Sequence, residues 1–507
     1  MEISTHNTIR NALYNFTSYV WLMIFSIIIT PIIVFKLGVR DYGIYVFVNT
    51  LLSLIGLIDL GIGISTLKHT AEYIATKQEH KLKELLYSMN SIYLIMGLVG
   101  LMVFLILGLM ADSFFANKLI GESQSFLIFL AAGLIFFTSI FTSIYGLSLN
   151  ALQRYDIGTK ISIIFVTISN LGTLIIASLN YKLVPIFFFQ LLINIISTIT
   201  LVIISRKIFP ILKFKFLFVK NEIIKSYKYG LSVFLTNIAG SSLTYLDRLI
   251  IPFFLGPSNL TYYSLPGNIT NKIPGISNNL SGVLFPVTVS LHSTNSMDRL
   301  RQLYIRSFRL LTILSASISI SIIFMADKIL FYWLNEDFSN RATQVLIILT
   351  ITSFILALQG PLTSFLLALG KMKFLSTLSV LMALLNAILL IILLPKYGIV
   401  GAAWAYLISI LPVIYMFYYT EKHYLDINIR IKHIKLYLQI FITSIPFIII
   451  ERVLIYPQIK DVSTLIFYGP LAVLIFLVLY YLFNFYEHED LSDFKKFIVN
   501  ITDKFKR

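Results

Sequence analysis

Long apolar runs follow one another along almost the whole chain, separated by short polar connections. Each run holds about 20 residues, the length that an α-helix needs to cross the hydrocarbon core of a bilayer. The pattern predicts an all-α polytopic membrane protein with about 14 transmembrane helices. The predicted spans are 12–35, 43–67, 89–111, 125–149, 158–179, 184–205, 229–253, 262–290, 305–326, 342–368, 373–394, 399–419, 436–455 and 463–485. The eighth span is the least apolar of them.

The pattern also occurs twice, because three short marks recur at similar offsets. They are Leu37-Gly38 with Tyr45 against Leu255-Gly256 with Tyr263, Ala151-Leu152-Gln153-Arg154 against Ala368-Leu369-Gly370-Lys371, and Asn170 against Asn386. The offsets of 218, 217 and 216 residues agree, so together they predict a duplicated bundle. We expect two pseudo-symmetric six-helix lobes and two extra C-terminal helices. Similar halves around a central cavity are a common transporter architecture.

Composition supports the membrane assignment and excludes two other classes of protein. Hydrophobic residues make up 57% of the chain, only 13% of residues are charged, and the mean hydropathy is +0.85. A soluble protein is about 45–50% apolar and about 25% charged. The net charge of +16 does not indicate a nucleic-acid partner, because the basic residues lie mostly in short loops between apolar runs. The absence of cysteine excludes a disulfide framework, and we expect no cleavable signal peptide.

The positions of lysine and arginine predict the orientation of the chain. The N-terminus, the loops after even-numbered spans and the tail carry 29 of them, whereas the loops after odd-numbered spans carry 9. Because cytoplasmic loops are rich in Lys and Arg, both termini are predicted to be cytoplasmic. The most basic loop joins spans six and seven, at the expected seam of the duplication. The predicted domains are therefore residues 1–220 (spans one to six), 221–425 (spans seven to twelve) and 426–507 (spans thirteen, fourteen and a cytoplasmic tail).

A few ionisable residues fall inside or at the ends of the predicted spans. An ionised side chain at the centre of a bilayer costs at least ~2.5–3.5 kcal/mol, so it should face a wet cavity or a partner. Asp59 lies in span two, Asp247 and Arg248 near the outer end of span seven, Lys272 in span eight, and Arg10 at the inner end of span one. Asp247 and Arg248 either form a local ion pair or line the cavity. Lys272 has no acid three or four residues away, which favours a place in the transport cavity.

Amide side chains follow the same spans. Asn11 and Asn15 lie on one face of span one, Asn237 lies in span seven, and Asn271 and Asn278 lie in span eight. They either line a polar interior shared by both halves or bond neighbouring helices. Other chemistry is scarce. We find no catalytic nucleophile and base, no metal-ligand spacing, no phosphate-binding loop for ATP, and therefore no implied cofactor.

Several segments together resemble one family of transporters. They are Asp59-Leu60-Gly61-Ile62-Gly63 with Lys68, His69 and Ala71-Glu72-Tyr73, then Ala151 to Asp156, Tyr229-Gly230-Leu231, Phe285-Pro286, and Asn386 followed by Leu393 to Trp404. The set resembles the polysaccharide-transport branch of the multidrug/oligosaccharidyl-lipid/polysaccharide exporter superfamily, and in particular Wzx-type flippases of O-antigen or capsule units. The resemblance covers about residues 7–420. Lys68 departs from it, since relatives often have arginine there.

The resemblance implies a function. Such proteins move undecaprenyl-pyrophosphate-linked oligosaccharides across the bacterial cytoplasmic membrane by alternating access, so we expect a lipid-linked oligosaccharide and membrane lipids as partners, with other polysaccharide-assembly proteins. Unpaired Lys or Arg in a cavity would offset desolvation of the pyrophosphate, and Asn, Ser, Thr or Tyr would bond sugar hydroxyls.

Two rival functions remain open. The first is a cation-coupled multidrug exporter of the same superfamily, which often carries an acid in the first span; here no acid occurs between Glu2 and Asp41. The second is a membrane polysaccharide polymerase or glycosyltransferase, which usually needs a large outward loop, and no loop here is long enough. We therefore expect a transporter and not an enzyme.

Overall fold

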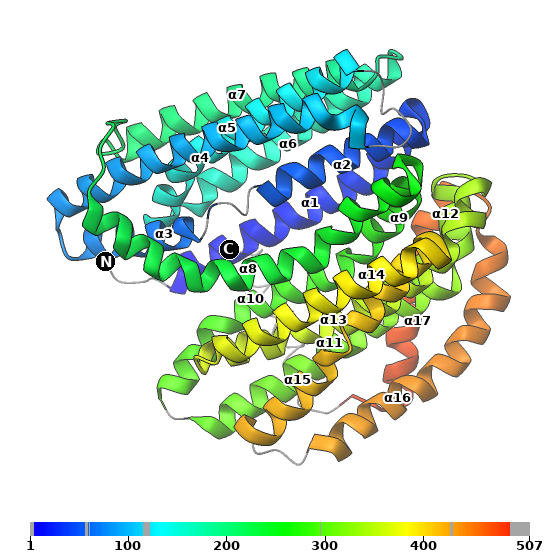
Figure 1. Cartoon of the computed structure of the whole chain (residues 1–507). Helices are drawn as coiled ribbons and strands as arrows, with labels where there is room; N and C mark the ends of the chain where they lie inside the picture. Colours follow the sequence, from blue (N-terminus) through cyan, green and yellow to red (C-terminus); the bar gives the residue numbers. More distant parts are fainter. Residues whose placement is uncertain are drawn as a thin grey trace, which may run out of the picture. The chain divides into compact units, whose positions relative to one another are not determined.

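The computed structural model describes residues 5–55, 59, 61–114, 122–294, 296–425 and 429–486, and every regular element in this part of the chain is a helix (Figure 1). The chain forms two compact units. One comprises Met1–Leu265 and Ser379–Ala402, and the other comprises Pro266–Leu378 and Ala403–Arg507. The first repeat and the first helix of the second repeat thus share a unit. The predicted lobe boundaries at residues 220 and 425 stay a prediction.

Seventeen α-helices are described. They are α1 (Thr5–Leu37), α2 (Val39–Ile55), α3 (Ile62–Ala75), α4 (Glu79–Phe114), α5 (Glu122–Ala151), α6 (Tyr155–Ser178), α7 (Leu183–Ile208), α8 (Lys220–Leu255), α9 (Pro257–Thr270), α10 (Lys272–Ser293), α11 (Met297–Phe324), α12 (Ala326–Trp333), α13 (Glu336–Ala368), α14 (Met372–Ser409), α15 (Pro412–Thr420), α16 (Ile429–Ile450) and α17 (Val462–Leu482). Two π-helical turns, Glu421–Leu425 and Glu451–Ile455, extend α15 and α16.

The prediction of an all-α polytopic membrane protein is confirmed. Each of the 14 predicted spans falls on helix, and ten helical segments within the described residues are long and apolar enough to cross a membrane. The sequence pattern missed interruptions in three spans. Span two divides into α2 and α3, span eight divides into α9 and α10 at Asn271, and span twelve divides into α14 and α15 at Ile410 and Leu411. Spans two and eight occupy the same place in the two repeats.

The backbone repeats as well as the sequence. Left-handed residues occur in equivalent connections of both halves, at offsets of 218, 217 and 218 residues. The pairs are Gly38 and Gly256 (φ 83° and 81°), Gln153 and Gly370 (φ 59° and 71°), and Asn180 and Gly398 (φ 61° and 59°). L-residues other than glycine rarely adopt a positive φ, so three matched pairs are unexpected in unrelated segments. The duplication predicted from weak sequence marks is therefore present in the fold.

Helix α14 covers span eleven and part of span twelve, and Gly398 divides it between the two. An added Cβ at Gly401 would lie 2.3 Å from the carbonyl oxygen of Leu393. Residues eight apart in a straight helix lie about 12 Å apart along its axis. The chain therefore reverses at Gly398, whose left-handed backbone (φ 59°, ψ −145°) separates two helices, as the predicted spans require.

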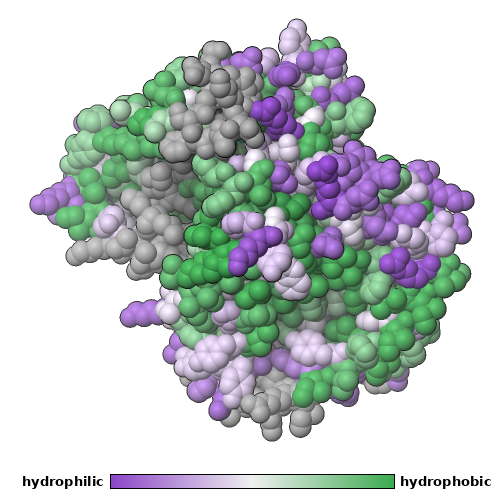
Figure 2. All heavy atoms as spheres, turned by 45° about the vertical axis from the view of Figure 1, so that its right-hand side comes forward, coloured by the Kyte–Doolittle hydropathy of each residue, from purple (hydrophilic) through white to green (hydrophobic). Residues whose placement is uncertain are grey.

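Each unit has its own apolar core, and much of the remaining surface is apolar too. Tyr93, Phe104 and Phe187 are fully buried in the first unit, and Phe447 and Phe476 in the second. Large apolar side chains also face outward, and on the face drawn in Figure 2 hydrophobic residues cover wide areas while strongly hydrophilic ones gather mainly in its upper right part. A soluble monomer rarely exposes apolar patches larger than a few hundred Å². This surface suits a lipid environment.

Candidate substrate-handling site

The interruption of span two is built around Asp59. Its carboxylate accepts a hydrogen bond from the Tyr93 hydroxyl (2.7 Å) and another from the backbone N–H of Gly63 (3.0 Å) in the first turn of α3. The first N–H groups of a helix lack partners within the helix and favour a negative charge. Asp59 thus caps α3 from outside the regular N-cap position, and the buried Tyr93 fixes the carboxylate in place.

Gly61 lets α3 begin against α8. Its φ of 72° is left-handed, and an added Cβ would lie 2.2 Å from the carbonyl oxygen of Gly230. Both glycines belong to segments on which the family resemblance rests. Gly61 and Gly230, which lie far apart in the sequence, therefore form the two sides of one close helix contact. No side chain fits between their backbones.

The interruption of span eight has a different cause. Pro274 has no N–H to donate to the carbonyl of Thr270, four residues earlier, where α9 ends. Asn271 is the single residue between the two helices, where its N–H still donates to the Gly267 carbonyl (3.0 Å), and Lys272 is the first residue of α10. Lys272 and Asn271 are both half-buried. We expected Lys272 to lie inside a continuous helix, but it lies directly after an interruption.

One face of α10 packs on α13 through small polar groups. The Ser277 hydroxyl donates to the carbonyl oxygen of Ala357, and the Ser364 hydroxyl donates to that of Ser281 (3.2 Å). Asn278 lies beside this contact, because an added Cβ on Gly360 would come 3.2 Å from its Oδ1. Small residues at a helix contact let backbones approach closely in membranes. Asn278 itself remains exposed enough to meet other groups.

Asp247 is the most enclosed of the candidate residues whose side chains the structure describes. Only 2% of it is exposed, and it accepts hydrogen bonds from the Tyr263 hydroxyl and from Asn386 Nδ2 (3.0 Å). Asn386, one of the sequence marks of the duplication, is itself fully buried. Arg248 is half-buried on the next position of α8. A buried charge is tolerated when neighbouring donors compensate it, and α9 and α14 supply two donors here.

The equivalent place in the first repeat is neutral. Tyr45, the counterpart of Tyr263, accepts a hydrogen bond from Gln190 Nε2 (3.0 Å), which also donates to the Thr173 hydroxyl (3.2 Å). The two repeats thus keep the tyrosine and differ in its partner, a carboxylate in one copy and an amide in the other.

Four predicted residues are placed only by their backbone. Arg10, Asn11 and Asn15 lie on α1 and Asn237 lies on α8, but their side chains lie outside the described residues. The structure assigns Asp59, Asp247, Arg248 and Asn237 to one unit and Asn271, Lys272 and Asn278 to the other. Their assignment to a shared substrate cavity stays a prediction.

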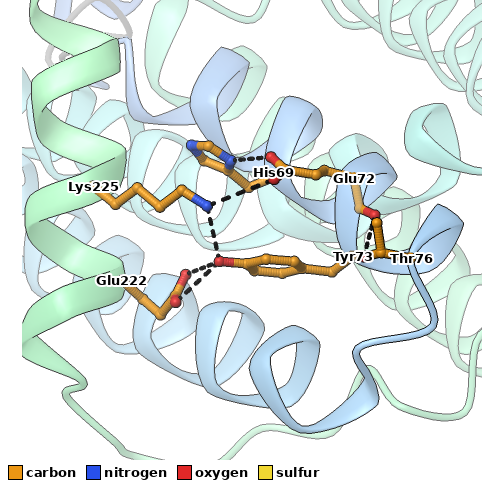
Figure 3. A network of polar contacts seen from close by, with 6 residues as sticks. All are labelled: His69, Glu72, Tyr73, Thr76, Glu222 and Lys225. Carbon is orange, nitrogen blue, oxygen red and sulfur yellow. Dashed lines mark hydrogen bonds and ion pairs between the residues drawn. The ribbon is translucent and has the colours of Figure 1, made fainter.

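A polar network that the sequence did not indicate joins α3 to the start of α8 (Figure 3). The Tyr73 hydroxyl donates to both carboxylate oxygens of Glu222 (3.0 and 2.9 Å) and accepts from Lys225 Nζ (3.0 Å). Lys225 Nζ also lies 3.9 Å from Glu72 Oε1, and His69 Nδ1 lies 3.0 Å from Glu72 Oε2. Glu222 is buried, and the Tyr73 hydroxyl is hydrogen-bonded to both of its carboxylate oxygens.

The network also shifts the titration of its members. The hydrogen bond from His69, followed by attraction to Lys225, lowers the pKa of Glu72 below its ordinary value. The hydrogen bond to Tyr73 raises the pKa of Lys225 against the opposing effect of burial. Both groups are thus held ionised at neutral pH. Only His69, Glu72 and Tyr73 lie in a segment that the family resemblance marked, and Glu222 and Lys225 are about 150 positions away along the chain.

The sequence also did not single out a buried acidic residue in span thirteen. Glu451 lies within span thirteen, where the π-helical turn begins, and is fully buried. Among the described residues neither of its carboxylate oxygens has a hydrogen-bond partner. Its position in an apolar run was visible in the sequence, but its burial was not. Within the same described residues no group of three or more His, Asp or Glu side chains could hold a metal ion.

Two family models match the chain. A model described as polysaccharide biosynthesis protein matches residues 8–292, and a model named MatE matches residues 233–392. A Shigella flexneri protein provisionally named an O-antigen transporter is 24% identical over 35% of this chain and 41% of its own length. A Haloferax volcanii protein named "Probable flippase AglR" is 24% identical over 38% of this chain and 40% of its own length. The chain thus spans about two fifths of each of these relatives.

Solved structures show the same fold. The lipid II flippase MurJ in an inward closed conformation superposes with a TM-score of 0.72 at 16% identity, covering 96% of this chain and all of that one. An inward-facing multidrug resistance transporter of the MATE family superposes with a TM-score of 0.63 at 11% identity, covering 81% of this chain and 94% of that one.

Proposed function

The chain belongs to the polysaccharide biosynthesis protein family, whose members are transporters rather than enzymes, and we propose that it is a flippase for lipid-linked oligosaccharides. The substrate would be an oligosaccharide on undecaprenyl pyrophosphate, destined for an O-antigen, a capsule or another surface polymer. The chain is a multi-pass membrane protein. We further propose that it lies in a bacterial cytoplasmic membrane with both termini in the cytoplasm, as the distribution of basic residues predicts.

The extent of the fold match carries this proposal. The flippase covers 96% of this chain, whereas the drug exporter covers 81%. We infer that the extra coverage includes helices beyond the twelve of the duplication. Here α16 and α17 follow the second repeat and pack against each other and against α11 in the second unit. A long polyprenyl tail needs apolar surface beside the passage for the sugar, and two added helices offer it.

The candidate residues would divide the work by chemistry. Lys272, Arg248 and Arg10 would neutralise the pyrophosphate, whose desolvation is costly without cations. Asn11, Asn15, Asn237, Asn271 and Asn278 would bond sugar hydroxyls with amide groups that both donate and accept. Asp59 and Asp247 already accept hydrogen bonds from protein donors, which suits them to position helices near the substrate rather than to bind an anion.

The interruptions in spans two and eight would act as hinges when the transporter alternates between its two access states. Transporters commonly form their binding sites at discontinuous helices and alternate access by moving one repeat against the other. Each interruption falls in the second span of its repeat, and Lys272 begins α10 directly after one of them. Movement at this point would carry the lysine together with the bound phosphates.

Complementation of a deletion strain tests the function and Lys272 together. Loss of the chain should remove the surface polysaccharide and accumulate the lipid-linked precursor. Lys272→Ala should lower surface polysaccharide about ten- to a hundredfold, since a hydrogen bond to a charged group is worth about 1.5–3 kcal/mol. Lys272→Arg should keep part of the activity. Lys460→Ala, which changes an exposed lysine, is the matched control and should behave like the native chain.

The outcomes separate the proposed function from the proposed role of Lys272. Normal surface polysaccharide and no precursor in the deletion strain would overturn the function. Normal polysaccharide in Lys272→Ala, at native protein level, would overturn only the role of the lysine. Loss of Lys272→Ala protein from the membrane, restored by removing an acid as well, would make Lys272 part of a structural ion pair.

A cation-coupled drug exporter is the second candidate. The match of the MatE model to residues 233–392 favours it for the second repeat. It predicts that the chain raises resistance to cationic drugs without any effect on surface polysaccharide, which the same deletion strain would reveal.

A further inference from the structure

The connection between α7 and α8 has a composition unlike the other connections. Residues 209–219 run mostly without regular structure from the end of α7 to the start of α8. Five basic residues lie between positions 206 and 220, and the first acid is Glu222. Phenylalanines alternate with the lysines, and Phe214, Phe216 and Phe218 are 43%, 59% and 46% exposed. Three exposed phenylalanines in a row of cations are unusual for a connection that faces only water.

The connection is nevertheless held in a fixed path within its unit. The backbone N–H of Leu217 donates to the Ser91 hydroxyl (2.9 Å), and that of Val219 donates to the Ser88 hydroxyl (3.0 Å), both on α4. The fully buried Leu212 anchors its other end. These contacts fix the backbone while leaving the phenyl rings and the lysines outward.

A cleft opens at the start of this connection. Its volume is about 450 Å³, and it is lined by Arg206, Pro210, Lys213 and Phe214. Arg206 is oriented by hydrogen bonds from Nε to the carbonyl oxygen of Leu212 (3.2 Å) and from Nη2 to the Tyr145 hydroxyl (3.3 Å). The Phe214 ring packs on Phe141 with the centroids 5.8 Å apart. The cleft therefore combines two cations with an oriented aromatic wall.

This cleft lies at the end of a membrane-crossing helix. Arg206 is in the last turn of α7, whose candidate span is Leu183–Ile208. Cations in the last turn of a span extend toward headgroups while their stems stay in apolar surroundings. A polybasic segment next to a span is attracted to anionic lipids, and aromatic rings partition into the same interface.

We propose that the connection at residues 206–220 is a docking site for an anionic glycerophospholipid of the adjoining leaflet. The headgroup phosphate binds between Arg206 and Lys213, and Phe214, Phe216 and Phe218 lie among the upper parts of the acyl chains. The occupant is bulk lipid rather than the transported substrate. The basic residues favour an anionic headgroup. The bound lipid would hold this connection, which joins the two repeats, at the membrane surface. The inference does not depend on the proposed function.

The test uses the full chain in nanodiscs of phosphatidylcholine with about one fifth phosphatidylglycerol. Phosphatidylglycerol retained by the protein is counted by native mass spectrometry. Lys213→Gln with Lys215→Gln should lower its retention about fivefold for each cation removed. The doubly conservative Lys213→Arg with Lys215→Arg should retain it. Lys182→Gln with Lys460→Gln changes two exposed lysines elsewhere, and should retain it as well.

Three results would overturn the proposal. The first is equal retention of phosphatidylglycerol by the native chain and the double glutamine variant. As a control for folding, the two proteins should have the same melting temperature in phosphatidylcholine alone. The second is an equal loss in the Lys182 and Lys460 control. The third is displacement of phosphatidylglycerol by undecaprenyl phosphate at the same mole fraction, which would assign the cleft to a polyprenyl substrate.

Discussion

At the scale of residues, the contacts between distant parts of the chain were the least predictable. The hydroxyl of Tyr73 binds Glu222 and Lys225 at once, yet neither partner has a sequence mark of its own. Asp247 and Asn386 were each noticed, one as a charge in a span and the other as a mark of the duplication. Their hydrogen bond was not foreseen, since 139 positions separate them. Residue types follow from the sequence, but pairings depend on how helices pack.

Tyr73→Phe should destabilise the protein measurably. It leaves the buried carboxylate of Glu222 without the hydroxyl that meets both its oxygens, and an unsatisfied buried polar group costs about 1–3 kcal/mol. Thermal unfolding of the purified protein in detergent measures the effect. Tyr181→Phe removes the hydroxyl of an exposed tyrosine and is the control. Equal melting temperatures for the two variants would contradict the importance of the network.

The same network predicts a pH dependence. Because the pKa of Glu72 is lowered in the folded protein, its contribution to stability is present above the ordinary pKa of a glutamate. That contribution is lost as the pH falls through the lower, folded value. Melting temperatures of the native chain and Glu72→Gln should therefore differ at pH 7 and converge in acid, and high salt should shrink the difference. A constant difference from pH 7 to pH 3 would contradict this role.

At the scale of elements, the helices followed from the apolar runs, but their interruptions did not. A run of about 20 apolar residues predicts a span whatever lies within it, so the divisions of spans two and eight were hidden. Their causes are local: the left-handed Gly61, with Asp59 capping the first turn of α3, in one case and Pro274 in the other. Lys272 was correctly noticed as a charge, while its position at an interruption came only from the structure.

The close contact of α3 with α8 predicts a large effect for Gly61→Ala. The new Cβ would collide with the Gly230 backbone, and the residue would also be strained by its left-handed conformation. Gly38→Ala separates the two causes, because Gly38 has φ 83° and open space around it. Strain alone costs about 1–2 kcal/mol. Gly61→Ala should therefore lower the melting temperature more than Gly38→Ala, and equal losses would show that the close contact yields easily.

At the scale of the whole molecule, the duplication was predictable because it is recorded in both sequence and backbone. Three short marks gave its period, and the left-handed pairs such as Gly38 with Gly256 show that the same connections are used twice. The division into units was not predictable in the same way, since α8 belongs to the second repeat by sequence and to the first unit by its contacts. Helix packing, which hydropathy does not record, decides that assignment.

Transbilayer movement of the substrate in a purified system shows directly whether the chain is a flippase. The purified chain would be reconstituted in liposomes with an undecaprenyl-pyrophosphate-linked oligosaccharide, and a sugar-modifying enzyme added outside would report how much of it is accessible. A flippase should raise the accessible share from the outer-leaflet fraction toward the whole pool, and Lys272→Ala should slow the rise. An accessible share that stays at the protein-free value, with folded protein in the membrane, would contradict the assignment as a flippase.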